Sequence, residues 1–270
     1  MSGQTKKNQK LNRVKASDNN LFSLCNKHIL VTGGTRGIGR AVSLRFARAG
    51  ATVLANYLRN EQAAEQLRGL AAKESLAITA SRADLTSEKG VEQLEGSLQE
   101  FGPSLSGMVH CAATGVHRPL EELTERHFDW TFNLNVRTFF KLMKLLTPRF
   151  SQGSSIVAVS SWGAVRALPH YSLVGSSKGA LEALARHLAA ELAPRGIRVN
   201  ILTAGAVRTD VWRAMPNSEE RLAEAERRTP IGRLTTVDEV AYGAQFLCSD
   251  ASVGVIGHTL VVDGGAGIVA

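Results

Sequence analysis

Tyr171 and Lys178 are the two residues of this chain whose types and spacing most directly suggest chemistry. They lie in HYSLVGSSKGALEALARHLAAEL, a stretch whose apolar residues have helical spacing. A phenol near an ammonium group can act as a proton donor, because the positive charge lowers the pKa of the phenol. Residues seven apart return to nearly the same face of a helix, and the phenol then lies roughly 4–5 Å farther along the axis than at a spacing of four. We therefore expect an aligned pair with an outward-displaced hydroxyl.

Other reactive side chains have alternative explanations. Ser161 could polarise a carbonyl, or it could only cap the turn that follows its strand. Tyr171 itself could be a packing residue at the start of a helix. His110 and Cys111 follow an apolar run, where such residues usually belong to the core. The histidines lack the spacing of metal ligands, so we expect no metal site.

Seven short runs rich in β-branched residues are the candidate strands that must position these residues. They span 28–32, 52–57, 76–84, 106–111, 154–160, 197–203 and 259–263. Ala- and Leu-rich stretches with helical periodicity lie between them. Continuous apolar strands that alternate with helices predict a parallel sheet covered on both faces. We expect the α/β class: a single doubly wound Rossmann domain with a mostly parallel seven-stranded sheet, binding ligands at the carboxyl ends of its strands.

A glycine-rich turn follows the first candidate strand, in HILVTGGTRGIGRAVSLRFARAG. Its glycines allow a tight turn and a close approach to a pyrophosphate, and the following helix offers unpaired N–H groups to the phosphates. Tight turns need glycine in any case, but the strand before and the helix after favour a dinucleotide site. The expected contacts are Gly33, Thr35, Arg36, Gly37, Ile38 and Gly39.

The end of the second candidate strand indicates which dinucleotide would bind. NAD sites usually place a carboxylate there for the ribose 2′-hydroxyl. In this chain the position is Tyr57, and Arg59 follows closely. Arg36 in the glycine turn adds a second guanidinium, and such groups suit a 2′-phosphate. The two arginines could be solvated loop residues, but the pattern favours NADPH.

Six motifs in order make the chain resemble the short-chain dehydrogenase/reductase family over residues 28–265. They are TGGTRGIG, RADL, LNVRTF, AVSSWG, AGAVRTD and VVDGG. The resemblance implies that this fold binds a nicotinamide cofactor through Asp84, Leu85, Ala112, Thr209 and Lys178. It also implies a catalytic group formed by Tyr171, Lys178, Ser161 and Asn135. Lys178 would hold the nicotinamide ribose, and Asn135 would organise the lysine and a water chain.

Three departures from the family pattern are informative. HCAA at 110–113 replaces the family's NNAG, and Ala204 replaces a usual proline. Val174 stands where the family's YxxxK places tyrosine, so that the tyrosine is Tyr171. This Y-x6-K spacing, with CAATGVHRPL and HFDWTFNLNV, resembles the NADPH-dependent enoyl-acyl carrier protein reductases of this fold, especially class III.

The displaced hydroxyl favours this reaction on chemical grounds. Ketone reduction places hydride on a carbon whose own oxygen is protonated, so the donor must lie close to that carbon. Reduction of an enoyl thioester places hydride on the β-carbon, and charge develops on the thioester oxygen three bonds farther on. A donor aimed at the developing charge stabilises the transition state. We expect an enoyl-thioester reductase; the alternatives are a 3-oxoacyl thioester or other ketone reductase and a non-catalytic NADP(H)-binding regulator.

The net charge of +8 is concentrated at the N-terminus. Residues 1–27 hold six basic residues and one acid, and we expect them to form a disordered tail before a reductase domain at 28–270. The tail lacks interleaved aromatic residues and the body lacks a basic stripe, so no nucleic-acid partner is expected. We expect no membrane partner either, since no apolar run approaches about 18 residues and no secretion signal is present. Three scattered cysteines indicate the cytoplasm.

The charged stretch at 211–234, bounded by Pro216 and Pro230, predicts a substrate lid. Its arginines could meet an acyl carrier protein or a phosphopantetheine phosphate, or they could be a solvated helix face. The partners expected are an acyl thioester and further copies of the chain. By the family resemblance, a tetramer or dimer would form through 120–150 and 171–194.

Overall fold

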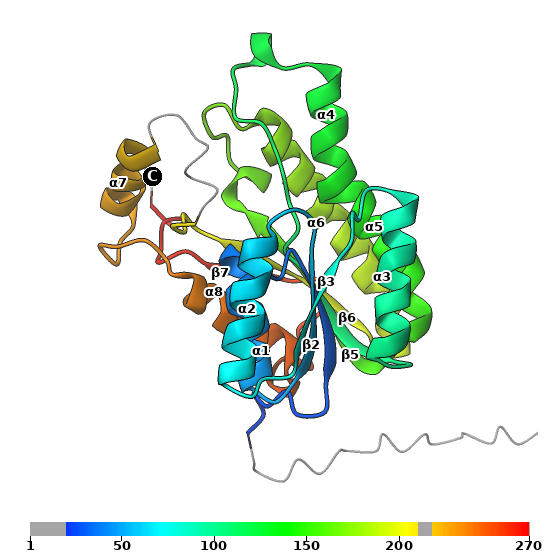
Figure 1. Ribbon diagram of the computed structural model, residues 1–270. Helices are drawn as coiled ribbons and strands as arrows, with labels where there is room; N and C mark the ends of the chain where they lie inside the picture. The colour runs from blue at the N-terminus through cyan, green and yellow to red at the C-terminus, as the bar shows by residue number, and fades with distance from the viewer. Residues whose placement is uncertain (1–19, 210–217, 270) are drawn as a thin grey trace, which may run out of the picture.

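Seven strands form one parallel sheet in the computed structural model, which describes residues 20–209 and 218–269 (Figure 1). The strands are β1 (His28–Thr32), β2 (Thr52–Tyr57), β3 (Ile78–Arg82), β4 (Leu105–His110), β5 (Phe150–Ser161), β6 (Arg198–Ala204) and β7 (Thr259–Val262). Their order is β3-β2-β1-β4-β5-β6-β7, and every pair is parallel. The predicted doubly wound fold is confirmed, with an all-parallel sheet in place of a mostly parallel one.

Helices cover both faces of the sheet (Figure 1). They are α1 (Gly37–Arg48), α2 (Glu61–Lys73), α3 (Glu88–Phe101), α4 (Glu125–Phe132), α5 (Thr138–Leu146), α6 (Ser172–Leu192), α7 (Ser218–Arg228) and α8 (Val237–Cys248). The apolar faces of α1 and α8 pack on one side of the sheet, and those of α3, α5 and α6 pack on the other. Strands β1 to β3 are added toward one edge of the sheet and β4 to β7 toward the other, so the strand order reverses between β1 and β4. Ligand sites of such folds form at this reversal.

Helices α2 and α3 begin with a side-chain cap, whereas α1 does not. The Asn60 side chain accepts from Ala63 N–H at the start of α2, and Ser87 accepts from Gly90 N–H at the start of α3. The residue before α1, Arg36, makes no such side-chain bond, and the first turn of α1 holds no acidic residue. The N–H groups at this helix end are therefore left without a side-chain cap.

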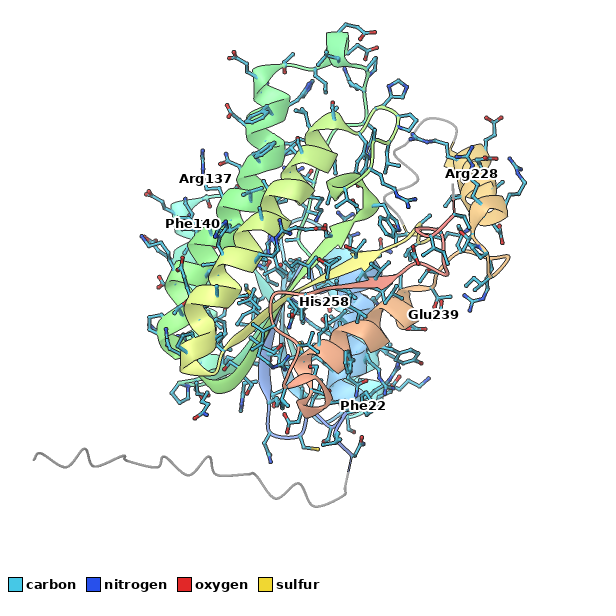
Figure 2. All side chains as sticks on the ribbon, turned by 180° about the vertical axis from the view of Figure 1, so that it is seen from behind. Phe22, Arg137, Phe140, Arg228, Glu239 and His258 are labelled. Carbon is cyan, nitrogen blue, oxygen red and sulfur yellow. The ribbon has the colours of Figure 1, made fainter. Side chains whose placement is uncertain are left out.

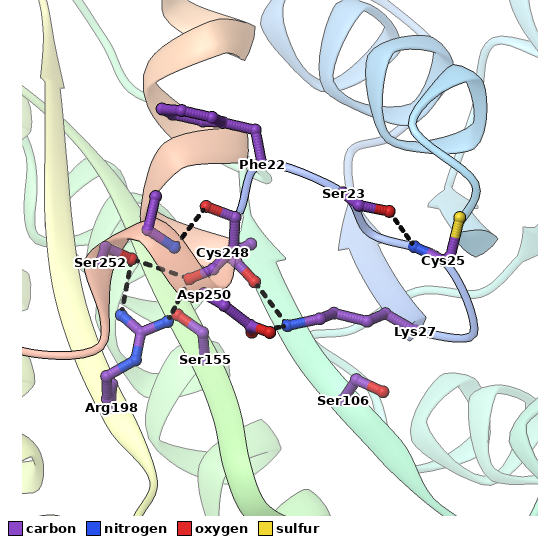
Figure 3. A network of polar contacts seen from close by, with 12 residues as sticks. Phe22, Ser23, Cys25, Lys27, Ser106, Ser155, Arg198, Cys248, Asp250 and Ser252 are labelled. Atoms are coloured by element: carbon purple, nitrogen blue, oxygen red, sulfur yellow. Dashed lines mark hydrogen bonds and ion pairs between the residues drawn. The ribbon is translucent and has the colours of Figure 1, made fainter. Parts of the chain in front are cut away.

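The predicted tail boundary at residue 27 is wrong, because residues 20–27 pack against the body of the protein. Leu24 is fully buried, and its N–H donates to the carbonyl of Ala49 at 2.9 Å. Phe22 lies beside α8, with its ring centroid 6.3 Å from that of Phe246 (Figure 2). Lys27 Nζ forms an ion pair with Asp250 at 2.7 Å (Figure 3). Residues 1–19 lie outside the described part of the chain.

Removing the Leu24 side chain should therefore destabilise the whole domain. Leu24→Ala is expected to lower the free energy of unfolding by about 2–5 kcal/mol, the cost of a large-to-small change in a core. Urea denaturation of the variant and the wild type measures the difference, with the exposed Leu21→Ala as the matched control. Equal effects of the two substitutions would show that the segment does not contribute to the core.

No helix in residues 20–209 and 218–269 has the length and apolar character required to span a bilayer. Cys25, Cys111 and Cys248 are all free thiols.

Candidate active site

The glycine turn between β1 and α1 has a backbone that side chains would obstruct. Gly33 and Gly37 have φ angles of +63° and +52°, which non-glycine residues rarely adopt. A Cβ at Gly39 would overlap the carbonyl oxygen of Gly33. The uncapped N-terminus of α1 lies directly behind this open cradle. A helix N-terminus without a side-chain cap behind a glycine turn is suited to a diphosphate, and binding of a dinucleotide here stays a prediction.

The other expected cofactor residues come to the same edge of the sheet. Ala112, after β4, lies against Gly33, where a Cβ would come 3.1 Å from Ala112 Cα. Thr209, after β6, lies against Gly37, 3.6 Å from a Cβ built there. Leu85 follows β3 and is buried. Segments that follow β4 and β6 therefore meet the turn that follows β1, with Thr35 buried inside it and Ile38 in the first turn of α1.

Asp84 and Tyr57, two of the predicted cofactor residues, already form hydrogen bonds within the protein. Asp84 accepts hydrogen bonds from the Thr86 N–H and hydroxyl, at 2.9 and 2.6 Å. Tyr57 is buried, and its hydroxyl donates to Glu61 at 2.8 Å and accepts from Arg68 at 3.1 Å. Tyr57 is thus the last residue of β2, and its hydroxyl is hydrogen-bonded to Glu61 and Arg68.

Arg36 and Arg59 are exposed, and within the described residues neither guanidinium has a hydrogen-bond or ion-pair partner. Glu61 is the nearby acid that the sequence argument did not include. The Arg68 guanidinium, together with the Tyr57 hydroxyl, lowers the pKa of Glu61. Glu61 is therefore an ionised carboxylate bound to Arg68. Arg36 and Arg59 remain available to an anion.

The phenol of Tyr171 lies beside the end of β5. Its hydroxyl oxygen is 3.3 Å from Ser161 Oγ, so these two predicted residues do come together. Tyr171 is the residue before α6, with φ −120° and ψ 10°, so it is not inside the helix. The helical spacing argument therefore does not set its position; contacts with neighbouring loops do.

The expected effect of Lys178 on the phenol is not observed. Burial raises the pKa of Tyr171, and the hydrogen bond with Ser161 offsets part of this rise. Lys178 Nζ donates instead to the carbonyl of Val159 at 2.8 Å. Burial lowers the pKa of Lys178 to about 8, so its ammonium group is close to titration at neutral pH.

Val174, which occupies the family's tyrosine position, is a packing residue. It is buried, and a Cβ at Gly115 would overlap its Cγ2 atom. The side chain at this position therefore packs on the segment after β4. A tyrosine at 174 would have to displace that segment, which explains physically why the phenol is at 171.

Asn135 is fully buried in a π-helical turn (Asn133–Arg137) before α5. Its Oδ1 accepts from Thr114 N–H, and its Nδ2 donates to the Thr114 carbonyl and to Ser177 Oγ, all at 2.9 Å. The amide therefore makes no bond to Lys178. It fastens the segment after β4 to α6.

Glu182 is a residue of the site that the sequence argument missed. It is buried four residues after Lys178, and its Oε1 accepts from Ser160 Oγ at 2.6 Å. Its negative charge favours the protonated form of Lys178 and so limits the fall of the lysine pKa. A lone acid on the apolar face of ALEALARHLAAEL was the available signal.

His110 is buried and Cys111 is half-buried at the end of β4. His110 Nδ1 lies 2.9 Å from Thr32 Oγ1, and burial lowers the pKa of the imidazole to about 3. Burial raises the pKa of Cys111 to about 12. Neither group is suited to nucleophilic chemistry near neutral pH.

A pocket of about 410 Å³ opens beside the Tyr171 ring. Residues from 118–120, from the 163–171 segment and from the start of α6 line it, and Arg118 and Arg166 are its cationic side chains. Helix α7 from the predicted lid lies nearby, since Arg221 donates to the Pro169 carbonyl at 3.4 Å. Residues 210–217 of that lid are outside the described part, so closure remains a prediction.

Gly163 leaves room for the phenol, and this gives a direct prediction. A Cβ at Gly163 would lie 2.5 Å from Tyr171 Cδ1 and overlap Cε1. Gly163→Ala should displace the ring and lower turnover on the order of 100-fold, as a misplacement of about 1 Å can do. Steady-state kinetics beside Gly69→Ala, where nothing lies within 4 Å of a new Cβ, measures the effect. Full activity of Gly163→Ala would exclude this placement of the phenol.

The fold, the phosphate cradle and the Ser161–Tyr171–Lys178 group together are typical of nicotinamide-dependent reductases. A family model described as Enoyl-(Acyl carrier protein) reductase matches residues 33–267. The chain belongs to the short-chain dehydrogenase/reductase family, in its enoyl-reductase type, and is an oxidoreductase of a family that binds nicotinamide cofactors.

Three known proteins show the range of this similarity. The 1-cyclohexenylcarbonyl-CoA reductase of Streptomyces collinus is 35% identical over 89% of this chain and 87% of its own length. The hydroxynaphthalene reductase-like protein Arp2 of Metarhizium majus is 32% identical, over 90% of this chain and 96% of that protein. The crystal structure of the enoyl-[acyl-carrier-protein] reductase (NADH) of Aquifex aeolicus has a TM-score of 0.83 at 27% identity and covers 92% of this chain and 98% of that one.

Proposed function

We propose that the protein reduces the carbon–carbon double bond of an enoyl thioester with NADPH, in fatty-acid or related biosynthesis. The observation that carries the proposal is the position of the phenol. Tyr171 lies beside Ser161 at the start of α6, whereas the family's usual tyrosine position is occupied by buried Val174. The similarity to a cyclohexenylcarbonyl-CoA reductase supports the same chemistry.

Tyr171 would donate a hydrogen bond to the thioester oxygen as negative charge develops there. Its raised pKa keeps the phenol protonated and therefore able to donate. The bound cofactor would supply hydride to the β-carbon. Lys178 would bind the nicotinamide ribose, and the glycine turn would hold the diphosphate. The pocket beside Tyr171 would admit the acyl thioester, with α7 as its cover.

The preference for NADPH rests on Arg36 and Arg59. Both guanidinium groups are exposed at the expected 2′-phosphate position, and the nearby Glu61 carboxylate is bound to Arg68. Charge-assisted hydrogen bonds to phosphate contribute about 1.5–3 kcal/mol each. The Aquifex relative uses NADH by its name, so the preference has to be measured for this chain.

The double variant Arg36→Ala/Arg59→Ala should bind NADPH about 10- to 100-fold more weakly, since about 1.4 kcal/mol corresponds to tenfold. Its affinity for NADH should change little, because that cofactor has no 2′-phosphate. Fluorescence titration with both cofactors measures this, with the exposed Arg126→Ala as a control. Equal losses for NADH and NADPH would contradict the assignment.

A ketone reductase of the same family is the second candidate. Ser161 lies within reach of the Tyr171 hydroxyl, the arrangement a carbonyl-polarising serine requires. The similarity to a hydroxynaphthalene reductase-like protein adds support. NADPH oxidation with crotonyl and acetoacetyl thioesters separates the candidates. We expect turnover of the crotonyl thioester, and turnover of the acetoacetyl thioester alone would overturn the first proposal.

We further propose that the protein is a cytoplasmic homo-oligomer that takes its substrate from coenzyme A or an acyl carrier protein. Exposed aromatic side chains gather on α4 and α5, within the region expected to join subunits. They are Phe128, Trp130 and Phe140, the last labelled in Figure 2. Burial of such a surface stabilises association. Light scattering would measure the number of subunits.

A further inference from the structure

His117 contacts the ring of Tyr171. Its ring centroid is 5.2 Å from that of Tyr171, with an angle of 41° between the planes. His117 lies on the segment between β4 and α4, far in sequence from α6. The family motifs that identify the site do not include it.

The backbone around His117 is held firmly against α6. Asn135 exchanges two hydrogen bonds with the Thr114 backbone and a third with Ser177 on α6. Gly115 lies in direct contact with Val174, also on α6. The imidazole is thus carried by a segment that these contacts fix at Thr114 and Gly115, two to three residues before His117.

One edge of the Tyr171 ring meets two glycines. A Cβ at Gly163 would overlap the Cδ1–Cε1 edge, and a Cβ at Gly175 would come 3.4 Å from Cδ1. The ring therefore contacts a backbone surface as well as His117. Without the imidazole, the phenol would lose one of these two contacts.

The state of the imidazole suits an aromatic contact. Its Nε2 is shielded from solvent and has no hydrogen-bond partner within residues 20–209 and 218–269. Burial, and secondarily the positive charge of Arg221 on α7, lower the pKa of His117. An unsatisfied buried nitrogen is costly, so such a group needs a compensating role.

We propose that His117 is a positioning residue that holds the Tyr171 phenol in its place beside Ser161. This inference rests on the proposed function, because it assigns to His117 the geometry on which alkene reduction depends. His117 acts through the phenol and need not touch substrate. Asn135, through Thr114, sets the place of the imidazole.

The test is the kinetics of His117→Ala and His117→Phe with crotonyl thioester and NADPH. His117→Ala should lower kcat about 10- to 100-fold, whereas the NADPH Kd and the Tm stay near the wild-type values. His117→Phe keeps a ring and should restore kcat to within about threefold of wild type. His258→Ala, at the opposite edge of the sheet before β7, is the control and should have wild-type kinetics (Figure 2).

A double-mutant cycle separates positioning from a general structural role. In a Tyr171→Phe background, His117→Ala should have almost no further effect, because residues that act as one unit are not additive. Wild-type kcat in His117→Ala, no recovery in His117→Phe, or full additivity with Tyr171→Phe would each overturn the inference. His117→Asn, which keeps polarity without a ring, replaces His117→Ala if that variant does not fold, and the same loss is expected.

The two proposals fail in different ways. A wild-type enzyme that reduces only acetoacetyl thioester would refute alkene reduction, and the His117 variants would then be compared on that substrate. A wild-type enzyme that reduces crotonyl thioester, with His117→Ala equally active, would refute the positioning role alone.

Discussion

Tyr171→Phe is expected to lower kcat for an enoyl thioester about 100- to 1000-fold. The variant keeps the ring in contact with His117 and Gly163 but removes the hydroxyl that lies 3.3 Å from Ser161 Oγ. Loss of one donor aimed at a developing oxyanion has an effect of about this size. The NADPH Kd should remain within about twofold, because the expected cofactor contacts lie on other segments. Steady-state kinetics and cofactor titration on the same preparation measure both quantities.

Tyr242→Phe is the matched control for this substitution. Tyr242 is a half-exposed residue of α8, on the other face of the sheet, and its loss of a hydroxyl should leave kcat unchanged. Wild-type turnover in Tyr171→Phe would remove the phenol from the mechanism. A large rise in the NADPH Kd would instead place Tyr171 in the cofactor site.

Lys178→Met is expected to lower kcat/KM about 1000-fold or more, the size of effect seen when a member of a catalytic group is removed. The buried ammonium is the positive charge that we propose binds the nicotinamide ribose, and methionine keeps a similar length without the charge. We expect losses in both cofactor affinity and turnover. The exposed Lys73→Met on α2 should behave as wild type.

The pH dependence follows from the same lysine. Burial disfavours the charged form, so the pKa of Lys178 falls to about 8, and the ammonium is lost as the pH rises through that value. The kcat/KM of the wild type should therefore be level below about pH 8 and decline above it. Glu182→Gln should move the decline to lower pH, because the carboxylate favours the charged lysine. A profile that is flat from pH 7 to 9.5 would show that this charge is not required.

The sheet and the phosphate cradle were predictable because each depends on a local pattern. Apolar runs set the strands of the sheet, and six motifs marked the carboxyl edge where the cofactor residues meet. The glycine turn was recognisable since Gly33 and Gly37 need positive φ angles. The packing of residues 20–27 was not predictable in this way, because it depends on contacts of Phe22, Leu24 and Lys27 with distant parts of the chain.

The internal geometry of the site could not be predicted, because it depends on contacts between distant segments. Nothing in HYS indicates that α6 begins at Ser172 and leaves Tyr171 outside the helix. The partners of Asn135 lie 21 and 42 residues away. Burial raises the pKa of Tyr171, and the spacing of Tyr171 and Lys178 in the sequence does not reveal that burial.

The position of the transferred hydrogen tests the central claim most directly. Crotonyl and acetoacetyl thioesters would each be incubated with the protein and with NADPH that carries deuterium as its transferable hydrogen, and the products would be examined by NMR. We predict a butyryl thioester with deuterium on the β-carbon and little product from the keto substrate. A 3-hydroxybutyryl thioester with deuterium on its carbinol carbon, and no labelled butyryl product, would contradict the account.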